Sequence, residues 1–125
     1  MNSLEQFSKK KYLSLETFRK NGKGVQTPVW FVPDGETIYV NTGVNSGKVK
    51  RIRNNSRVNI APCKMDGTTC GTWVPANARE ISEAEVSKKA NRFLDRKYGL
   101  MRKMFSLGSA MQGRQDTVLE IKLAE

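Results

Sequence analysis

Short stretches of alternating polar and apolar residues, separated by tight-turn sequences, constrain the fold of this chain most strongly. In residues 12–20, Leu13 and Leu15 fall on one face of an extended chain, with polar residues between them. This period of two predicts a half-buried strand. Asn21-Gly22 follows, a typical two-residue hairpin turn because both residues tolerate positive φ.

Five further strands are predicted from the same kinds of signal. Residues 25–32 are rich in β-branched and aromatic residues, and Pro33-Asp34-Gly35 then predicts a turn, because proline presets φ and glycine accepts the left-handed conformation. With residues 37–42, the first third of the chain is expected to form a three-stranded meander. The remaining strands are expected at residues 57–62, at residues 68–80 with a bend at Gly71 and Pro75, and at residues 117–123.

Helical signals interrupt the strands at two main places. Ser46 is a suitable N-cap, and Val49 and Ile52, three residues apart, predict a short helix that ends at Asn54-Asn55. A capping-box sequence begins at Ser82 and precedes a second helix. The apolar stripe of that helix consists of Val86, Ala90, Phe93 and Leu94, and we also expect a short helical lead-in at residues 4–11 and a further helical piece at residues 98–107.

The order of these elements predicts an α+β fold, a small six-stranded antiparallel barrel with short flanking helices. The chain of 125 residues suits one compact domain, residues 1–125. No apolar run approaches the roughly 20 residues that span a bilayer, and the N-terminus lacks the basic-then-apolar pattern of a secretory signal. We therefore expect a cytoplasmic protein without a membrane partner.

The composition excludes several kinds of chemistry. The chain has no histidine, which excludes Ser-His-Asp and Cys-His catalysis. Cys63 and Cys70 could form a disulfide across a hairpin, but free thiols are the expectation in the cytosol, and two cysteines alone make a poor metal site. What remains is chemistry done by a cofactor, or no chemistry. The formal net charge of +10 indicates an anionic partner.

The stretch from Tyr39 to Lys50 places a lysine at the start of a helix, after a loop that contains glycines. Unpaired N–H groups at a helix N-terminus attract phosphates, and Lys48 adds a full charge there. The stretch is not a P-loop, since only three residues separate Gly43 from Gly47 and Val49 follows the lysine. A capped helix with a solvated lysine remains an equally good interpretation of this stretch alone.

Two other features have open interpretations. A basic cluster runs from Lys48 to Arg57, but no aromatic residue that could stack on bases lies within it, so nucleic acid is an unfavoured partner. Pro28 lies inside a predicted strand, which indicates an edge, a bulge or the approach of something other than a strand. A planar ring lying against this strand would fit, and so would an edge strand with Trp30 in the core.

Several motifs and their order along the chain resemble those of the pyridoxamine 5′-phosphate oxidase-like split β-barrel superfamily, in particular of its flavin and deazaflavin oxidoreductase branch. The motifs are Tyr12-Leu13-Ser14-Leu15-Glu16-Thr17-Phe18-Arg19-Lys20, Thr27-Pro28-Val29-Trp30-Phe31, Ile38-Tyr39-Val40, Ser46-Gly47-Lys48-Val49-Lys50-Arg51-Ile52-Arg53, Val58-Asn59-Ile60-Ala61-Pro62-Cys63 and Gly71-Thr72-Trp73-Val74. They cover most of residues 12–80. The resemblance implies a split β-barrel homodimer with two cofactor sites, each built from both subunits.

The resemblance also implies which residues hold the cofactor. Lys48 matches the phosphate-binding lysine of the family, with Ser46 and Gly47 beside it. Thr42 matches a polar position near the phosphate or ribityl chain, and Arg51 a position that assists with the phosphate. The strand segment that flanks the ring system corresponds to Gln26, Thr27, Pro28, Val29 and Trp30.

The chain is shorter than the true pyridoxamine phosphate oxidases and lacks a counterpart of their C-terminal substrate-binding region, so we expect redox chemistry on another small molecule. FMN is the first choice of cofactor, and the deazaflavin coenzyme F-420 is a close alternative that suits the basic surface. In either case the cofactor ring would do the hydride chemistry. A non-catalytic flavin-binding sensor or carrier, and a basic nucleic-acid-binding barrel, are the alternative functions.

Overall fold

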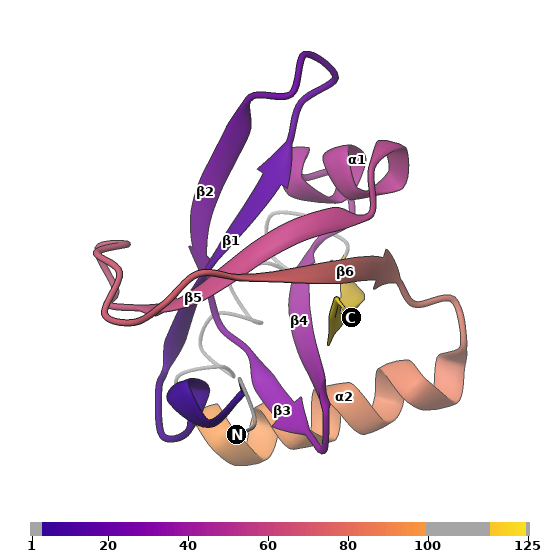
Figure 1. Ribbon diagram of the computed structural model, residues 1–125. Coiled ribbons are helices and arrows are strands. Elements are labelled where there is room, and N and C mark those ends of the chain that lie inside the picture. The colour runs from indigo at the N-terminus through magenta and orange to yellow at the C-terminus, as the bar shows by residue number, and fades with distance from the viewer. Residues whose placement is uncertain (1–3, 100–115, 125) are drawn as a thin grey trace.

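The computed structural model describes residues 4–99 and 116–124 (Figure 1). It contains seven strands, two α-helices and one short 3₁₀-helix within these residues. The strands are β1 (Tyr12–Phe18), β2 (Gly24–Val29), β3 (Val32–Asp34), β4 (Thr37–Gly43), β5 (Arg57–Cys63), β6 (Val74–Glu80) and β7 (Asp116–Leu123). The helices are η1 (Glu5–Phe7), α1 (Gly47–Asn54) and α2 (Ala84–Tyr98).

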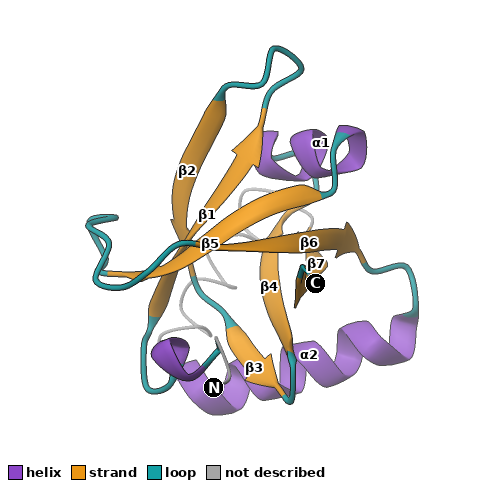
Figure 2. Ribbon diagram, in the orientation of Figure 1, coloured by secondary structure: helices purple, strands orange, loops and turns teal. Residues whose placement is uncertain are grey.

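All seven strands form one antiparallel sheet in the order β2-β1-β5-β6-β7-β4-β3. The two edge strands, β2 and β3, are consecutive in the chain and are joined by Trp30 and Phe31 alone. Because successive Cα atoms are about 3.8 Å apart, this link holds the two edges within roughly 11 Å of each other. The sheet must therefore curl, and Figure 2 shows the strands crossing around a common interior. This is an α+β arrangement consistent with a split barrel.

The inner face of the curled sheet holds the main hydrophobic core. Leu13 and Leu15 of β1 lie opposite Val29 and Thr27 of β2, so the period of two in the sequence places the leucines inside. Both leucines are fully buried. Helix α1 adds Val49 and Ile52 to the same cluster, as the three-residue spacing predicted. These two side chains pack α1 against the barrel.

Helix α2 packs on the outer face of β3, β4 and β7, away from α1 (Figure 1). Its buried residues are Ala90, Leu94 and Tyr98, with Val86 and Phe93 partly buried beside them. They meet Tyr39 and Val118, which point outward from the sheet. The apolar stripe predicted for this helix is therefore confirmed, and it covers only one part of the outer face of the sheet.

The prediction of six strands is wrong, because the expected strand at residues 25–32 is two strands. The backbone of Phe31 is bonded to α2: its N–H donates to the Tyr98 hydroxyl (3.0 Å), and its carbonyl accepts from Lys97 Nζ (2.9 Å). A residue whose N–H and C=O are both engaged in this way cannot continue the strand ladder. The chain therefore leaves β2 at Trp30 and enters β3 on the opposite edge.

The predicted meander is also wrong, because β4 pairs with β3 and β7 and not with β2. The strand expected at residues 68–80 is shorter, and β6 begins at Val74. The Gln6 side chain explains this difference: it accepts from the Thr72 N–H (2.9 Å) and donates to the Thr72 carbonyl (2.8 Å). The first part of the expected strand forms an isolated bridge between Cys63 and Thr69, and the Cys70 N–H donates to the Pro62 carbonyl (2.9 Å).

The helix ends differ in detail from the predictions. The N-cap of α2 is Glu83 and not Ser82, and no side-chain capping bond forms, since the Glu83 carboxylate pairs with Arg79 (3.2 Å). The helical lead-in is confirmed only as η1. The helical piece expected at residues 98–107 lies outside the described residues, except that Tyr98 ends α2. Within the described residues, no helix is long and apolar enough to cross a bilayer.

Candidate functional site

The start of α1 is the first part of the candidate site. Strand β4 ends at Gly43, and the Ser46 N–H donates to the Gly43 carbonyl (3.0 Å) in the turn between them. Ser46 is the N-cap, as predicted, but its hydroxyl makes no capping bond. Among the described residues, Ser46 Oγ is the buried side-chain oxygen or nitrogen that lacks a hydrogen-bond partner. Such an atom is costly to bury without a partner, and a water or a ligand atom from outside the chain could supply one.

Arg51 folds back over this helix start. Its Nε donates to Thr17 Oγ1 of β1 (2.6 Å), and Thr17 is fully buried. A Cβ added to Gly47 would lie 2.8 Å from Arg51 Nη1, so the guanidinium lies directly against the glycine. The glycine therefore has a structural role beyond helix capping, because it makes room for the arginine beside the first turn of α1.

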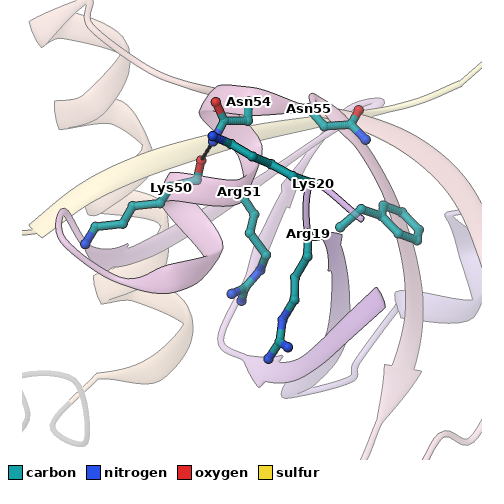
Figure 3. A pocket seen from close by; sticks show the side chains of 7 residues that line it. Arg19, Lys20, Lys50, Arg51, Asn54 and Asn55 are labelled. Atoms are coloured by element: carbon teal, nitrogen blue, oxygen red, sulfur yellow. Dashed lines mark hydrogen bonds between the residues drawn. The ribbon is translucent and has the colours of Figure 1, made fainter. Parts of the chain in front are cut away.

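A basic cleft of about 550 Å³ continues from Arg51 between α1 and the β1–β2 hairpin. In Figure 3 the side chains of Arg19 and Arg51 lie side by side and point the same way, while Lys50 points to another side. Burial and the nearby charge of Arg19 lower the pKa of Arg51. The cleft is lined by Phe18, Arg19, Lys20, Lys50, Arg51, Asn54 and Asn55, which include no carboxylate. Two adjacent guanidiniums without a carboxylate are suited to bind an anion such as phosphate.

The other predicted site residues near α1 are Lys48 and Thr42. Lys48 lies in the first turn of the helix and is half-buried, and Thr42, near the end of β4, is buried. The structure therefore brings Thr42, Ser46, Gly47, Lys48 and Arg51 to one end of the barrel. Helix dipole and side chains give this end a positive potential.

The predicted segment from Gln26 to Trp30 extends away from this end along β2. Gln26 and Pro28 are exposed on the outer face of the sheet, and the Gln26 amide donates to the Glu16 carboxylate (3.2 Å). Thr27 and Val29 point inward. Val25 of β2 pairs with Thr17, the residue that accepts the hydrogen bond from Arg51. Trp30 lies five residues after Val25, which is roughly 17 Å farther along an extended chain.

Trp30 is not a simple core residue of the barrel. Its ring stacks on Tyr98 of α2, with centroids 4.7 Å apart and planes 8° from parallel. In the segment from Gln26 to Trp30, two side chains are therefore exposed on the outer face, two point inward, and the Trp30 ring packs under α2. Of these residues, Gln26 and Pro28 are accessible to a ligand on the outer face.

The sequence reasoning missed two residues of the site, Arg19 and Thr17. Arg19 precedes the hairpin turn at Asn21-Gly22, and a basic residue beside a turn carries no signal that it faces a helix 30 residues later. Thr17 follows Leu13 and Leu15 at a period of two. That position predicts a buried side chain, and its hydroxyl could have been expected to need a partner.

The sequence matches a family model described as pyridoxamine 5′-phosphate oxidase over residues 3–125. The chain belongs to this family. The resemblance to the pyridoxamine 5′-phosphate oxidase-like superfamily, stated from the sequence motifs, is thereby confirmed. Comparison with curated proteins gives no significant match.

Solved structures of low sequence identity share the fold of this family member. The conserved hypothetical protein Rv2991 from Mycobacterium tuberculosis is 17% identical, with a TM-score of 0.71, and the match covers 100% of this chain and 82% of that one. A protein related to general stress protein 26, of the pyridoxinephosphate oxidase family, from Clostridium acetobutylicum is 13% identical (TM-score 0.68; 97% and 80% covered). The heme storage protein HutZ from Vibrio cholerae is 14% identical (TM-score 0.64; 97% and 87% covered).

Proposed function

We propose that this protein is a flavin- or deazaflavin-dependent oxidoreductase that binds the phosphate of its cofactor at the start of α1. The observation that carries the proposal is the buried, unpartnered Ser46 Oγ, which lies one residue before the Gly47 that the Arg51 guanidinium packs against. A phosphate oxygen would satisfy this hydroxyl, and the arginine would offset its charge. The family membership supports the same proposal.

The residues present fit such a cofactor. Lys48 and the N–H groups at the start of α1 would hold the phosphate together with Ser46 and Arg51. Thr42 would support the phosphate or ribityl chain, and the outer face of β2 at Gln26 and Pro28 would flank the ring. The bound ring supplies hydride transfer. The chain's own residues bind and orient the cofactor, and we assign none of them as acid or base.

FMN is the cofactor that we propose first, and coenzyme F-420 is the alternative. Both carry a phosphate that the α1 site would bind. The cleft beside Arg51 adds Arg19, Lys20 and Lys50, and these cations would also suit the anionic tail of F-420. The substrate would be a small molecule that exchanges hydride with the ring.

We further propose a homodimer with a cofactor site at each side of the subunit interface. Among the described residues, helix α2 packs mainly on the outer face of β3, β4 and β7. On the outer face of β2, β1 and β5, the polar side chains of Glu16, Gln26 and Asn59 are joined by hydrogen bonds, since the Glu16 carboxylate accepts from both amides. Ser14 and Ala61 beside them are buried. A second subunit on this surface would enclose a ring lying along Gln26 and Pro28.

A non-catalytic carrier of a flavin is the second candidate function. The residues lining the cleft beside α1 include no carboxylate and no histidine that could relay protons, which suits a carrier as well as an enzyme. One structural relative stores heme, but this chain lacks histidine, a common ligand of heme iron. We therefore propose a flavin or deazaflavin for the carrier as well.

The test is an absorbance titration of the purified protein with FMN and, separately, with coenzyme F-420. Lys48→Ala is the test variant, and Lys88→Ala is its matched control, since Lys88 is an exposed lysine of α2, which lies away from α1 (Figure 1). We expect saturable binding of one cofactor, weakened strongly by Lys48→Ala and little by Lys88→Ala. If neither cofactor binds at micromolar protein, the proposal fails. Reoxidation of the reduced, bound cofactor by small-molecule acceptors would then separate an enzyme from a carrier.

A further inference from the structure

A second cleft lies at the far end of the barrel from α1. It has a volume of about 440 Å³ and lies between η1, β3 and the C-terminal end of α2. Figure 1 shows these three elements meeting at one end of the barrel. Its apolar walls are formed by Phe7, Val32, Pro33 and Phe93. Phe7 also contacts Phe31 edge-to-face, with ring centroids 5.9 Å apart, so part of the cleft has an aromatic wall.

Three cations line the same cleft, namely Lys9, Arg96 and Lys97. The Lys97 ammonium is the most enclosed of them: it donates to the Phe31 carbonyl (2.9 Å) and lies 3.7 Å from the centroid of the Phe31 ring. Burial lowers the pKa of Lys97 to about 8. No described carboxylate pairs with it, and the aspartate of β3, Asp34, pairs with Lys89 instead (3.0 Å).

This arrangement is unbalanced in charge. A cation that is partly removed from water is destabilised unless an anion accompanies it. The other titratable groups that face Lys97 are Lys9, from the segment after η1, and Arg96 and Tyr98, from α2. The two cations increase the imbalance. Tyr98 is uncharged, since burial raises its pKa to about 12.

We propose that this cleft binds a small aromatic carboxylate. The ring of such a ligand would lie against Pro33 and Phe93, above the buried Phe7, and its carboxylate would pair with Lys97 and with Arg96 at the rim. An aromatic ring satisfies the apolar walls, and the carboxylate supplies the charge that the cleft lacks. The site is separate from the α1 site, so this proposal does not depend on the cofactor.

The test is isothermal titration calorimetry with 2-naphthoate and with its neutral counterpart, 2-naphthamide. We expect 2-naphthoate to bind saturably at pH 7 and at least roughly tenfold more tightly than the amide, because a charge-assisted bond is lost with the amide. Lys97→Met should remove this preference, and Lys97→Arg should retain it. Affinity for the carboxylate should fall as the pH rises above about 8, where the free amine loses its charge.

Two control variants locate the ligand. Arg51→Gln, in the α1 cleft, and Lys88→Met, on the exposed side of α2, should leave the affinity for 2-naphthoate unchanged. A loss of binding in Arg51→Gln would place the ligand at α1 and overturn the proposal. Equal binding of acid and amide, or no binding of either, would also overturn it. If Lys97→Met does not fold, the acid–amide comparison and the pH series on the unaltered protein decide the question.

Discussion

The Tyr98 hydroxyl joins three segments of the chain, and its removal should measurably destabilise the fold. It lies 2.8 Å from the Lys11 carbonyl before β1 and 2.8 Å from the Phe31 carbonyl between β2 and β3. It also accepts from the buried Phe31 N–H (3.0 Å). In Tyr98→Phe that N–H keeps its position but loses its acceptor, because the phenyl ring still fills the site.

The expected loss of unfolding free energy in Tyr98→Phe follows from the cost of an unsatisfied buried donor, about 1–3 kcal/mol. For a domain of 125 residues, an unfolding entropy of about 2.1 cal/mol/K per residue gives roughly 0.26 kcal/mol/K in total. A loss of about 2 kcal/mol should therefore lower the melting temperature by about 8 °C. The ring stacking of residue 98 on Trp30 is kept in the variant, so the change reports on the hydroxyl.

The assay is thermal unfolding followed by circular dichroism, without cofactor and at one fixed protein concentration, because ligand binding and assembly both shift apparent stability. Tyr12→Phe is the matched control, since the structure gives the Tyr12 hydroxyl no hydrogen bond to a described residue. We expect it to change the melting temperature little. An unchanged melting temperature in Tyr98→Phe would refute the view that this hydroxyl fastens the link between the two sheet edges.

Three further predictions concern α1 and its surroundings. Gly47→Ala should displace the guanidinium of Arg51 and weaken FMN binding while leaving riboflavin binding unchanged, as measured by fluorescence titration. Ile52→Ala should cost about 2–5 kcal/mol of unfolding free energy in urea, because its side chain is buried in the barrel core. The Arg53 hydrogen bond lowers the pKa of Glu80, so this stabilisation is present above the unfolded pKa of the carboxyl and is lost as the pH falls through its folded value. Arg53→Gln should therefore flatten the acid side of the stability curve, and an unchanged curve would contradict this.

Most of what could be predicted follows from local patterns in the sequence. A hairpin turn forms at Asn21-Gly22, but only Gly22 of the pair adopts a positive φ, and the turn is longer than two residues, since the Arg19 N–H donates to the Lys23 carbonyl. The burial of Leu13 and Leu15 and the helix face of Val49 and Ile52 each depend on residues a few positions apart. Those predictions are confirmed because hydrophobic period and turn chemistry act over such distances. The family was recognisable from motifs for a similar reason, since most of the motifs lie within one strand or at the start of one helix.

The rest depended on partners that are far apart in the sequence. The break between β2 and β3 is set by Tyr98, 67 residues after Phe31. The shortening of the strand before Val74 is set by Gln6, 66 residues before Thr72. The site at the start of α1 also depends on a distant partner, since Arg51 is held by Thr17, 34 residues earlier in the chain. No local pattern in the sequence indicates such pairings, which arise only when the sheet curls.

The central claim is that the start of α1 recognises a phosphate. The most direct measurement compares the dissociation constants of FMN and riboflavin, which differ by the phosphate alone, for the unaltered protein, Ser46→Ala and Arg51→Gln. The account predicts that the unaltered protein prefers FMN by at least roughly tenfold, since charge-assisted bonds are worth about 1.5–3 kcal/mol, and that both variants lose most of this preference. Equal affinity for FMN and riboflavin in the unaltered protein, or an undiminished preference in Arg51→Gln, would contradict it.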